Sequence, residues 1–319
     1  MGAGPAKQRI ATKYPFMPNH TICILGGTGF IGGHLVKRLL ADEHEIKVLD
    51  RRPAGRSELK AMPGVDLVPA DAHDVPTLEH EFAGCDVVIN LIGILNEKGH
   101  DGSGFRHAHV DLPRKVVDTC RKLGIRRLLH MSALGADAAY GHSYYQRTKG
   151  EGENLVHADA ALDVTSFRPS VIFGPGDSFF NRFGGLLKLA PVFPLAGAKA
   201  RFQPVYVGDV VEAYARAIDN PQTFGQRYDL CGPRVYTLQQ LVEYTARTMG
   251  LKRLIVPLGD GLARLQANVM EYVPGKPFSR DNYLSLKKDN VCDGEFPPVF
   301  GIEPTALESV VPSYIGPKG

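Results

Sequence analysis

The sequence has few cysteines and no long apolar run. No stretch approaches the roughly 20 apolar residues of a transmembrane helix, so we expect no membrane span. The five cysteines are widely spaced and contain no C-x-x-C pair, which argues against a disulfide framework. We therefore expect reduced thiols and a cytoplasmic or matrix-like reducing compartment. The cysteines are Cys23, Cys85, Cys120, Cys231 and Cys292.

An excess of one charge is also missing. The 37 Lys and Arg residues stand against 34 Asp and Glu residues, and the net charge is +3. This balance argues against nucleic acid as a partner. No cluster of metal-ligand residues is found, so we expect no metal site. Residues 1–20 lack the apolar core of a signal peptide, and we interpret them as a disordered arm or a cloning remnant.

What the sequence does have is a glycine-rich turn between two apolar patterns. Thr21–Leu25 resembles a strand buried on both faces, and Ile31, Leu35 and Leu39 recur along one face of a helix. The turn between them fits G-x-G-x-x-G, which places a dinucleotide pyrophosphate at the N-terminus of the helix. The candidate cofactor-binding residues here are Gly26, Gly27, Thr28, Gly29, Phe30, Ile31 and Gly32.

An acidic residue follows this turn at the spacing typical of dinucleotide-binding folds. Asp50 ends the next apolar run, and a carboxylate there bonds the ribose hydroxyls and favours NAD. Arg51 and Arg52 come directly after it, and an arginine can hold the extra phosphate of NADP. The two signals conflict, and the arginine pair is alternatively a solvated loop.

Two later strand ends offer further cofactor contacts. Asp71, followed by Ala72, either accepts a hydrogen bond from the adenine amino group or caps the segment leading to Leu78. Gly93 either lets the backbone approach the cofactor or simply ends its strand. It follows Leu91 and Ile92, which complete this candidate group.

Strand and helix patterns alternate from Thr21 to about Pro169. This alternation predicts β-α-β units and an α/β fold, a Rossmann-type doubly wound parallel sheet with a smaller C-terminal cap domain. We expect the nucleotide domain to span residues 21–168 and to be completed by 203–231, with the cap at 169–202 and 232–319. The expected strands after the first are 46–49, 67–69, 87–91, 127–131 and 164–168, and the expected later helices are 112–123, 144–157 and 238–249.

A catalytic-looking cluster follows the fifth expected strand. Tyr145 and Lys149 lie four residues apart, on one face of a helix, and Ser132 ends the strand before it. An ammonium beside the phenol would lower its pKa and ease proton transfer, while the serine hydroxyl would orient the reacting oxygen. The alternative is an exposed amphipathic turn with no chemistry.

These motifs together resemble the short-chain dehydrogenase/reductase superfamily, in its extended or atypical branch, over about residues 21–312. The residues that carry the resemblance are 26–32, 90–93 (Asn-Leu-Ile-Gly), Ser132, Tyr145, Lys149 and 168–175 (Arg-Pro-Ser-Val-Ile-Phe-Gly-Pro). Other runs resemble more narrowly the group that contains the nucleotide-binding accessory subunit of respiratory complex I and its bacterial relatives. These runs are 87–93, 168–174, 203–210 (Gln-Pro-Val-Tyr-Val-Gly-Asp-Val), 277–282 (Pro-Phe-Ser-Arg-Asp-Asn) and 289–291 (Asp-Asn-Val).

The resemblance implies a tightly held NADP(H), with NAD(H) as the alternative. Arg51 would contact the extra phosphate, although Asp50 departs from the usual NADP(H) pattern. Lys149 would bond the nicotinamide ribose. The nicotinamide pocket would be lined by Pro169, Ser170 and Val171. In the complex I subunit the nucleotide is thought to be structural, and relatives of the group are linked to ubiquinone synthesis.

Three functions therefore stay open. The first is a nucleotide-bound accessory protein of a respiratory or quinone-handling assembly, with slow or no chemistry, peripheral to an inner membrane. The second is an active oxidoreductase or epimerase on a small carbonyl, sugar or quinone-related substrate. The third is a nucleic-acid-binding member of the superfamily, against which the charge balance argues.

Two segments of the expected cap are apolar enough to matter for partners. Asn181–Arg201 either lines a greasy pocket, meets a partner or packs as core. Val256–Val273 carries Leu262, Leu265 and Val269 and forms either an amphipathic surface for a membrane or subunit, or ordinary core.

Overall fold

We describe the chain from a computed structural model that covers residues 19–51 and 57–316. Residues 1–18 of the expected N-terminal arm and Arg52 lie outside the described residues.

The fold is built on a seven-stranded sheet in which every neighbouring pair of strands is parallel. The strand order is β11-β6-β5-β4-β1-β2-β3, so the order reverses between β1 and β4. Such a reversal opens a ligand crevice at the carboxyl ends of the strands. The strands are β1 (Thr21–Leu25), β2 (Glu45–Asp50), β3 (Val65–Pro69), β4 (Val87–Asn90), β5 (Arg127–Met131), β6 (Asp163–Pro169) and β11 (Gln226–Leu230).

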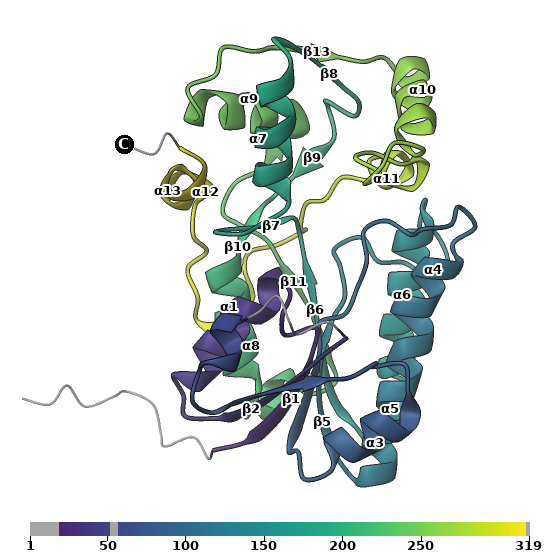
Figure 1. Cartoon of the computed structure of the whole chain (residues 1–319), viewed down its shortest axis with the longest axis vertical. Helices are drawn as coiled ribbons and strands as arrows, with labels where there is room; N and C mark the ends of the chain where they lie inside the picture. Colours follow the sequence, from purple (N-terminus) through teal and green to yellow (C-terminus); the bar gives the residue numbers. More distant parts are fainter. Residues whose placement is uncertain (1–18, 52–56, 317–319) are drawn as a thin grey trace, which may run out of the picture.

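Helices cover both faces of this sheet (Figure 1). Ile22 and Ile24 of β1 face one core cluster, while Cys23 and Leu25 face the other, because successive strand residues alternate sides. On the first face lie α1 (Phe30–Leu40) and α8 (Val207–Ala217), and on the second lie α3 (Val75–Phe82), α5 (Leu112–Leu123) and α6 (Tyr144–Val156). Short helices α2 (Ser57–Lys60) and α4 (Ser103–Arg106), a π-helical turn η2 (His107–Asp111) and the 3-10 turns η3 (Pro221–Thr223) and η4 (Pro298–Phe300) complete this part.

A smaller cap stands over the carboxyl edge of the sheet, at the top of Figure 1. The chain enters it from β6 and again from β11. Its helices are α7 (Phe179–Leu189), α9 (Leu238–Thr248), α10 (Asp260–Met270), α11 (Arg280–Ser285), α12 (Leu307–Val310) and α13 (Pro312–Ile315). Its strand pairs are β7 (Ile172–Phe173) with β10 (Val205–Tyr206), β8 (Val192–Leu195) with β13 (Leu254–Pro257), and β9 (Arg201–Phe202) with β12 (Tyr236–Thr237).

The predicted fold class is confirmed, and the expected strands and helices lie within one or two residues of the observed ones. The residue limits of the two domains stay a prediction, although β11 does join the sheet beside β6. None of the helices in the described ranges has the length and apolar character that a membrane crossing needs. Within the same ranges, no three His, Cys, Asp or Glu residues are grouped so as to hold a metal ion.

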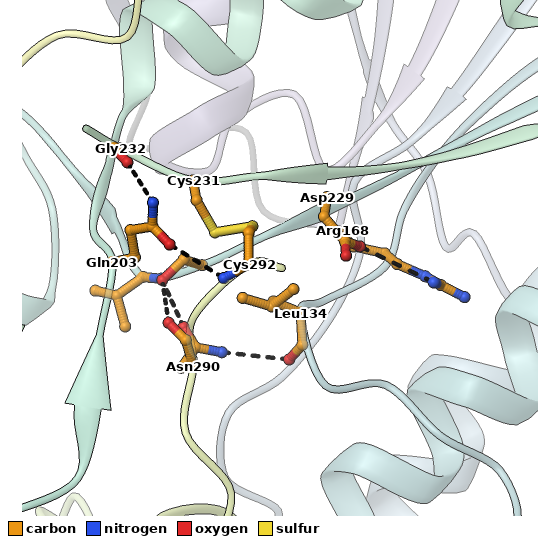
Figure 2. Close-up of a disulfide and its surroundings, with 10 residues drawn as sticks. Leu134, Arg168, Gln203, Asp229, Cys231, Gly232, Asn290 and Cys292 are labelled. Carbon is orange, nitrogen blue, oxygen red and sulfur yellow. Dashed lines mark hydrogen bonds and ion pairs between the residues drawn. A yellow bond between two sulfur atoms is a disulfide. The ribbon is translucent and has the colours of Figure 1, made fainter. Parts of the chain in front are cut away.

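One sequence expectation is wrong, because two of the five cysteines form a disulfide. Cys231, directly after β11, is bonded to Cys292, with Cα atoms 6.1 Å apart (Figure 2). Cys23, Cys85 and Cys120 are free, as expected, and all three are buried. The bonded pair is 61 residues apart, and spacing along the chain does not reveal that the fold brings the two thiols together. The cysteine pattern therefore gives no support to a reducing compartment.

The disulfide predicts a simple thiol count. Protein unfolded without reductant should show three alkylatable thiols, and five after reduction, by intact mass after alkylation. Because the bond closes a loop of about 60 residues, reduction should lower the free energy of unfolding by up to ~4 kcal/mol. A Cys231→Ser/Cys292→Ser variant should lose this response to reductant. Five thiols in the unreduced protein would contradict the bond.

Candidate nucleotide-binding and catalytic site

The glycine-rich turn presents an open helix end. Gly29 is the N-cap of α1, its backbone is extended, and no side chain caps the helix. The Gly29 N–H donates to the Gly26 carbonyl at 3.0 Å, which folds the turn back under the helix. The first N–H groups of α1 are thus available to an anion at the positive end of the helix dipole.

Two of these glycines are required by the backbone. Gly26 has a φ of +80°, which side-chain-bearing residues rarely adopt. A Cβ at Gly32 would lie 2.5 Å from both the Gly26 oxygen and the Gly27 Cα, so a side chain there would separate α1 from β1. Phe30 and Ile31 are half-buried at the start of the same helix. The turn therefore has the cradle that a pyrophosphate needs.

The carboxyl end of β2 supplies the acidic residue. The Thr28 hydroxyl donates a hydrogen bond to the Asp50 carboxylate, which ties β2 to the glycine turn. Arg51 follows at once and is exposed. The structure therefore places Asp50 against the turn and exposes Arg51 to solvent.

The loop after β3 has a local explanation for Asp71. Its Oδ1 accepts the His73 N–H at 3.0 Å, an Asx turn, while the actual N-cap of α3 is Asp74, which accepts the Thr77 N–H. The predicted capping role thus belongs to Asp74. Ala72 is buried in the core beneath the loop.

Positive charge gathers around His73 in this loop. His73 stacks on His107 with ring centroids 3.6 Å apart, and the Lys115 ammonium donates to the His73 carbonyl at 2.8 Å. The pKa of His73 is lowered by burial, and further by His107, Lys115 and Arg51. Two permanent cations, Lys115 and Arg51, therefore act on His73 past β2 and β3, and the Asp71 carboxylate opposes them.

The end of β4 comes close to the predicted catalytic helix. A Cβ at Gly93 would lie 3.0 Å from the Lys149 Nζ and 3.5 Å from the His109 Nε2, so only glycine fits this gap without displacement. Leu91 and Ile92 run beside the glycine turn, since Leu91 N–H donates to the Leu25 carbonyl and Ile92 would touch a Cβ at Gly26.

His109 was not identified from the sequence, yet it lies inside this cluster. Its Nε2 accepts the Ile94 N–H at 3.1 Å and its Nδ1 lies 3.0 Å from the Thr148 hydroxyl. Burial and then the Lys149 charge lower the pKa of His109 to about 2, so the ring stays neutral. It sits on the π-helical turn η2, a distortion often found at functional sites, and its ring packs edge-on to Tyr145 at 5.5 Å.

Helix α6 begins at a capping box and carries the predicted pair inward. The Ser143 hydroxyl accepts a hydrogen bond from the Gln146 N–H, and the Gln146 side-chain oxygen accepts one from the Ser143 N–H. Lys149 is buried, and its ammonium donates to the Met131 carbonyl at 2.9 Å. Burial lowers the pKa of Lys149 to about 8. The exposed-turn alternative for this pair is therefore not what the structure shows.

Tyr145 differs from the expectation in its acidity. Burial, and then the Asp281 charge, raise the pKa of Tyr145 to about 12. Among the described residues, no hydrogen-bond partner of the Tyr145 hydroxyl is found. The expected lowering by Lys149 is not among the causes of this pKa, which are burial and the Asp281 carboxylate.

Ser132 also differs from the expectation. Its hydroxyl donates to the Glu153 carboxylate at 3.1 Å, one helical turn beyond Lys149 on α6. Glu153 is 1% exposed and also accepts the Arg168 Nε at 2.8 Å. The Ser132 hydroxyl is therefore held within a buried ion-pair network. The Tyr145, Lys149, Glu153 spacing in steps of four was a signal that could have pointed to Glu153.

The C-terminal segment holds the site from both sides, through residues of the runs 277–282 and 289–291. Asp281 of α11 is 8% exposed and accepts the backbone N–H groups of Tyr144 and Tyr145 at 2.6 and 3.2 Å. It therefore supplies an acidic cap for α6 from the far end of the sequence.

Asn290, from the same C-terminal segment, fixes the backbone of the predicted nicotinamide pocket. Its side-chain oxygen accepts from the Ser170 hydroxyl at 2.6 Å and from the Val171 N–H at 3.2 Å, and its amide donates to the Leu134 carbonyl (Figure 2). The predicted Pro169–Val171 segment is thus fixed by a residue two positions before the disulfide-bonded Cys292.

The described candidate residues therefore meet at one edge of the sheet, because the strands that carry them are parallel. The chain belongs to the NAD dependent epimerase/dehydratase family, whose model matches residues 22–231. It is a nucleotide-binding protein of that family, and NAD is the cofactor that the family description names.

Relatives and a solved structure agree with this assignment. The chain is 28% identical over 294 residues to NADH dehydrogenase [ubiquinone] 1 alpha subcomplex subunit 9, mitochondrial, of Rattus norvegicus, covering 89% of this chain and 77% of the relative. It is 27% identical over 239 residues to the ceramide reductase of Caulobacter vibrioides, covering 75% and 74%. The structure of Pal from Bacillus thuringiensis has a TM-score of 0.76 at 18% identity, over 92% and 97% of the chains, which supports the fold.

Adjacent glycines of α1 give a matched test of the cradle. Gly32→Ala places its methyl against backbone, so it should destabilise the fold by about 3 kcal/mol and abolish nucleotide binding. Gly33→Ala meets nothing within 4 Å and should raise stability by up to ~1 kcal/mol, with affinity kept. Thermal unfolding with and without NADPH measures both, and equal effects of the two variants would contradict the packing argument.

Proposed function

We propose that this protein binds NADP(H) as a tightly held nucleotide and acts as an accessory protein of a respiratory or quinone-handling assembly, with slow or no turnover. The observation that carries the proposal is the engagement of the Ser132 hydroxyl by buried Glu153. A serine fixed in this network is held away from the role of orienting a reacting carbonyl.

The acidity of Tyr145 supports the same conclusion. A general acid or base works best when its pKa lies near the operating pH. The pKa of Tyr145 is raised to about 12 by burial and Asp281, which disfavours proton transfer from its hydroxyl near neutral pH. Lys149 and Gly93 then serve to hold the nucleotide. Lys149 bonds the nicotinamide ribose, and Gly93 lets the protein backbone approach the cofactor.

The adenine end of the cradle favours the extra phosphate. Arg51 is exposed beside Asp50, and Arg51 and Lys115 both act on the pKa of His73. The Asp50 carboxylate already accepts a hydrogen bond from the Thr28 hydroxyl, so it is less available to the hydroxyls of a ribose. We assign Arg51 to the phosphate, Asp71 to the adenine edge, and Pro169 to Val171 to the nicotinamide. When bound, the nicotinamide would supply the capacity for hydride transfer.

The names of the relatives support a place in a respiratory assembly. The curated name of the Rattus norvegicus relative assigns it to mitochondrial NADH dehydrogenase. We extend this to an assembly of the same class here, with the chain peripheral to the membrane and in contact with another subunit.

Parallel titrations with NADPH and NADH test the cofactor. Nicotinamide fluorescence is a clean readout because the sequence has no tryptophan. NADPH should bind at least about tenfold more tightly, and Arg51→Ala should remove most of that preference by deleting a charge-assisted bond. Arg126→Ala, at the opposite edge of the sheet, is the matched control. NADH preference would instead favour an NAD-dependent dehydrogenase or epimerase.

A second function, reduction of a small carbonyl or quinone-related substrate, is favoured by two observations. Tyr145 and Lys149 lie on one inward face of α6, and the relative from Caulobacter vibrioides is named a reductase. Under the leading proposal, NADPH oxidation with short-chain quinones or sugar nucleotides should stay at background. Turnover that is lost in Tyr145→Phe, kept in Tyr144→Phe and accompanied by intact NADPH binding would establish the enzyme instead.

A further inference from the structure

Helix α10 of the cap is amphipathic, but its large apolar side chains lie on the exposed face and small side chains lie on the buried face. Its inward face carries the small residues Ala263 and Ala267, 2% and 0% exposed, which pack with Ala196 and Tyr283. The opposite face carries large apolar side chains at helical spacing. These are Leu262 (59% exposed), Leu265 (57%) and Val269 (59%), with Tyr272 (72%) just beyond the helix end. Of the two alternatives for this segment, the structure therefore gives an exposed apolar surface.

The β8–β13 pair extends this surface. Leu254 is paired with Val192, and they are 62% and 47% exposed, while the next residue, Ile255, is buried. Helix α10 is joined to this ribbon because the Gln266 side chain donates to the Pro194 carbonyl at 3.1 Å. Leu189, at the end of α7, is 80% exposed close by in sequence. We name this set the outer apolar surface: Leu189, Val192, Leu254, Leu262, Leu265, Val269 and Tyr272.

Basic charge is concentrated in the same two segments. Residues 181–199 and 251–276 contain seven Lys and Arg and only two acidic residues, Asp260 and Glu271, whereas the whole chain has an excess of three positive charges. Both acids are neutralised locally. Lys287 pairs with Asp260, and Arg280 pairs with the buried Glu271 at 2.6 Å. Within the described part of the chain, no ion pair is found for the cations of these two segments.

We propose that the outer apolar surface docks onto a bilayer that contains anionic lipid. Leucine and valine side chains would enter the acyl boundary, Tyr272 would lie at the headgroup level, and cations such as Lys188 and Lys252 would meet the anionic headgroups. The proposal deepens the peripheral placement proposed above and is independent of nucleotide binding or turnover.

Charge and shape select a bilayer over the other occupants. A two-fold dimer through this surface would bring two like-charged basic segments together, which opposes association. A protein partner usually inserts anchors into pockets. The cavity beside α11 and the cavity beside Asp289 are both lined by residues outside the outer apolar surface. A lipid surface needs no pocket because it conforms to projecting side chains.

Vesicle flotation with the full chain tests the proposal. The protein should float with vesicles of phosphatidylcholine and phosphatidylglycerol, and far less with phosphatidylcholine alone or at high salt. Leu262→Gln/Leu265→Gln/Val269→Gln should bind at least about tenfold more weakly, since three aliphatic side chains no longer leave water. Lys188→Glu/Lys252→Glu should lose the preference for anionic vesicles. Tyr140→Gln, at an 85% exposed side chain outside this surface, is the matched control and should bind normally.

Two further measurements keep the outcome clear. The triple variant should retain its thermal unfolding and NADPH titration, because its substituted side chains are exposed in the folded protein. Absence of binding to either vesicle, or undiminished binding of the triple variant, would overturn the proposal. A vesicle-free dimer that the triple variant abolishes would identify a second copy as the occupant and overturn it as well.

Discussion

The close approach of α1 to the end of β1 is the constraint on which the site depends. Gly32 has no room for a side chain against Gly26 and Gly27, so the helix start lies directly on the strand end. This contact aims the first N–H groups of α1 at the crevice between β1 and β4. Because the other strands of the sheet are parallel to β1, the loops that follow their carboxyl ends lie at the same edge of the sheet.

Sequence reasoning located this convergence well, because the signals involved are local. The glycine turn, the apolar strands and the Tyr145–Lys149 spacing each depend on residues a few positions apart. What it missed depends on contacts between distant residues. Glu153 meets Ser132 from another element, and His109 enters the site through a π-helical turn that no simple periodicity reveals. The acidity of Tyr145 was misjudged because burial cannot be read from spacing.

The cysteine prediction failed for the same reason. Cys231 and Cys292 meet because the chain returns from the cap across the end of β11, and composition gives no sign of that path. The covalent bond lies beside Asn290, whose amide group fixes the Ser170 and Val171 backbone segment. A feature remote from the nucleotide motifs thus supports the segment that is predicted to line the nicotinamide pocket.

Asp281 couples the docking of the cap to the ionisation of Tyr145 on α6. When α11 is docked, its carboxylate stabilises the helix start and, after burial, is the charge that raises the pKa of Tyr145. By reciprocity, any ligand that stabilises the tyrosinate form must weaken the docking of α11, and any partner that tightens the cap must hold the phenol in its neutral form. Under the proposed function, an assembly that clamps the cap would favour the neutral phenol of Tyr145 without contacting that residue.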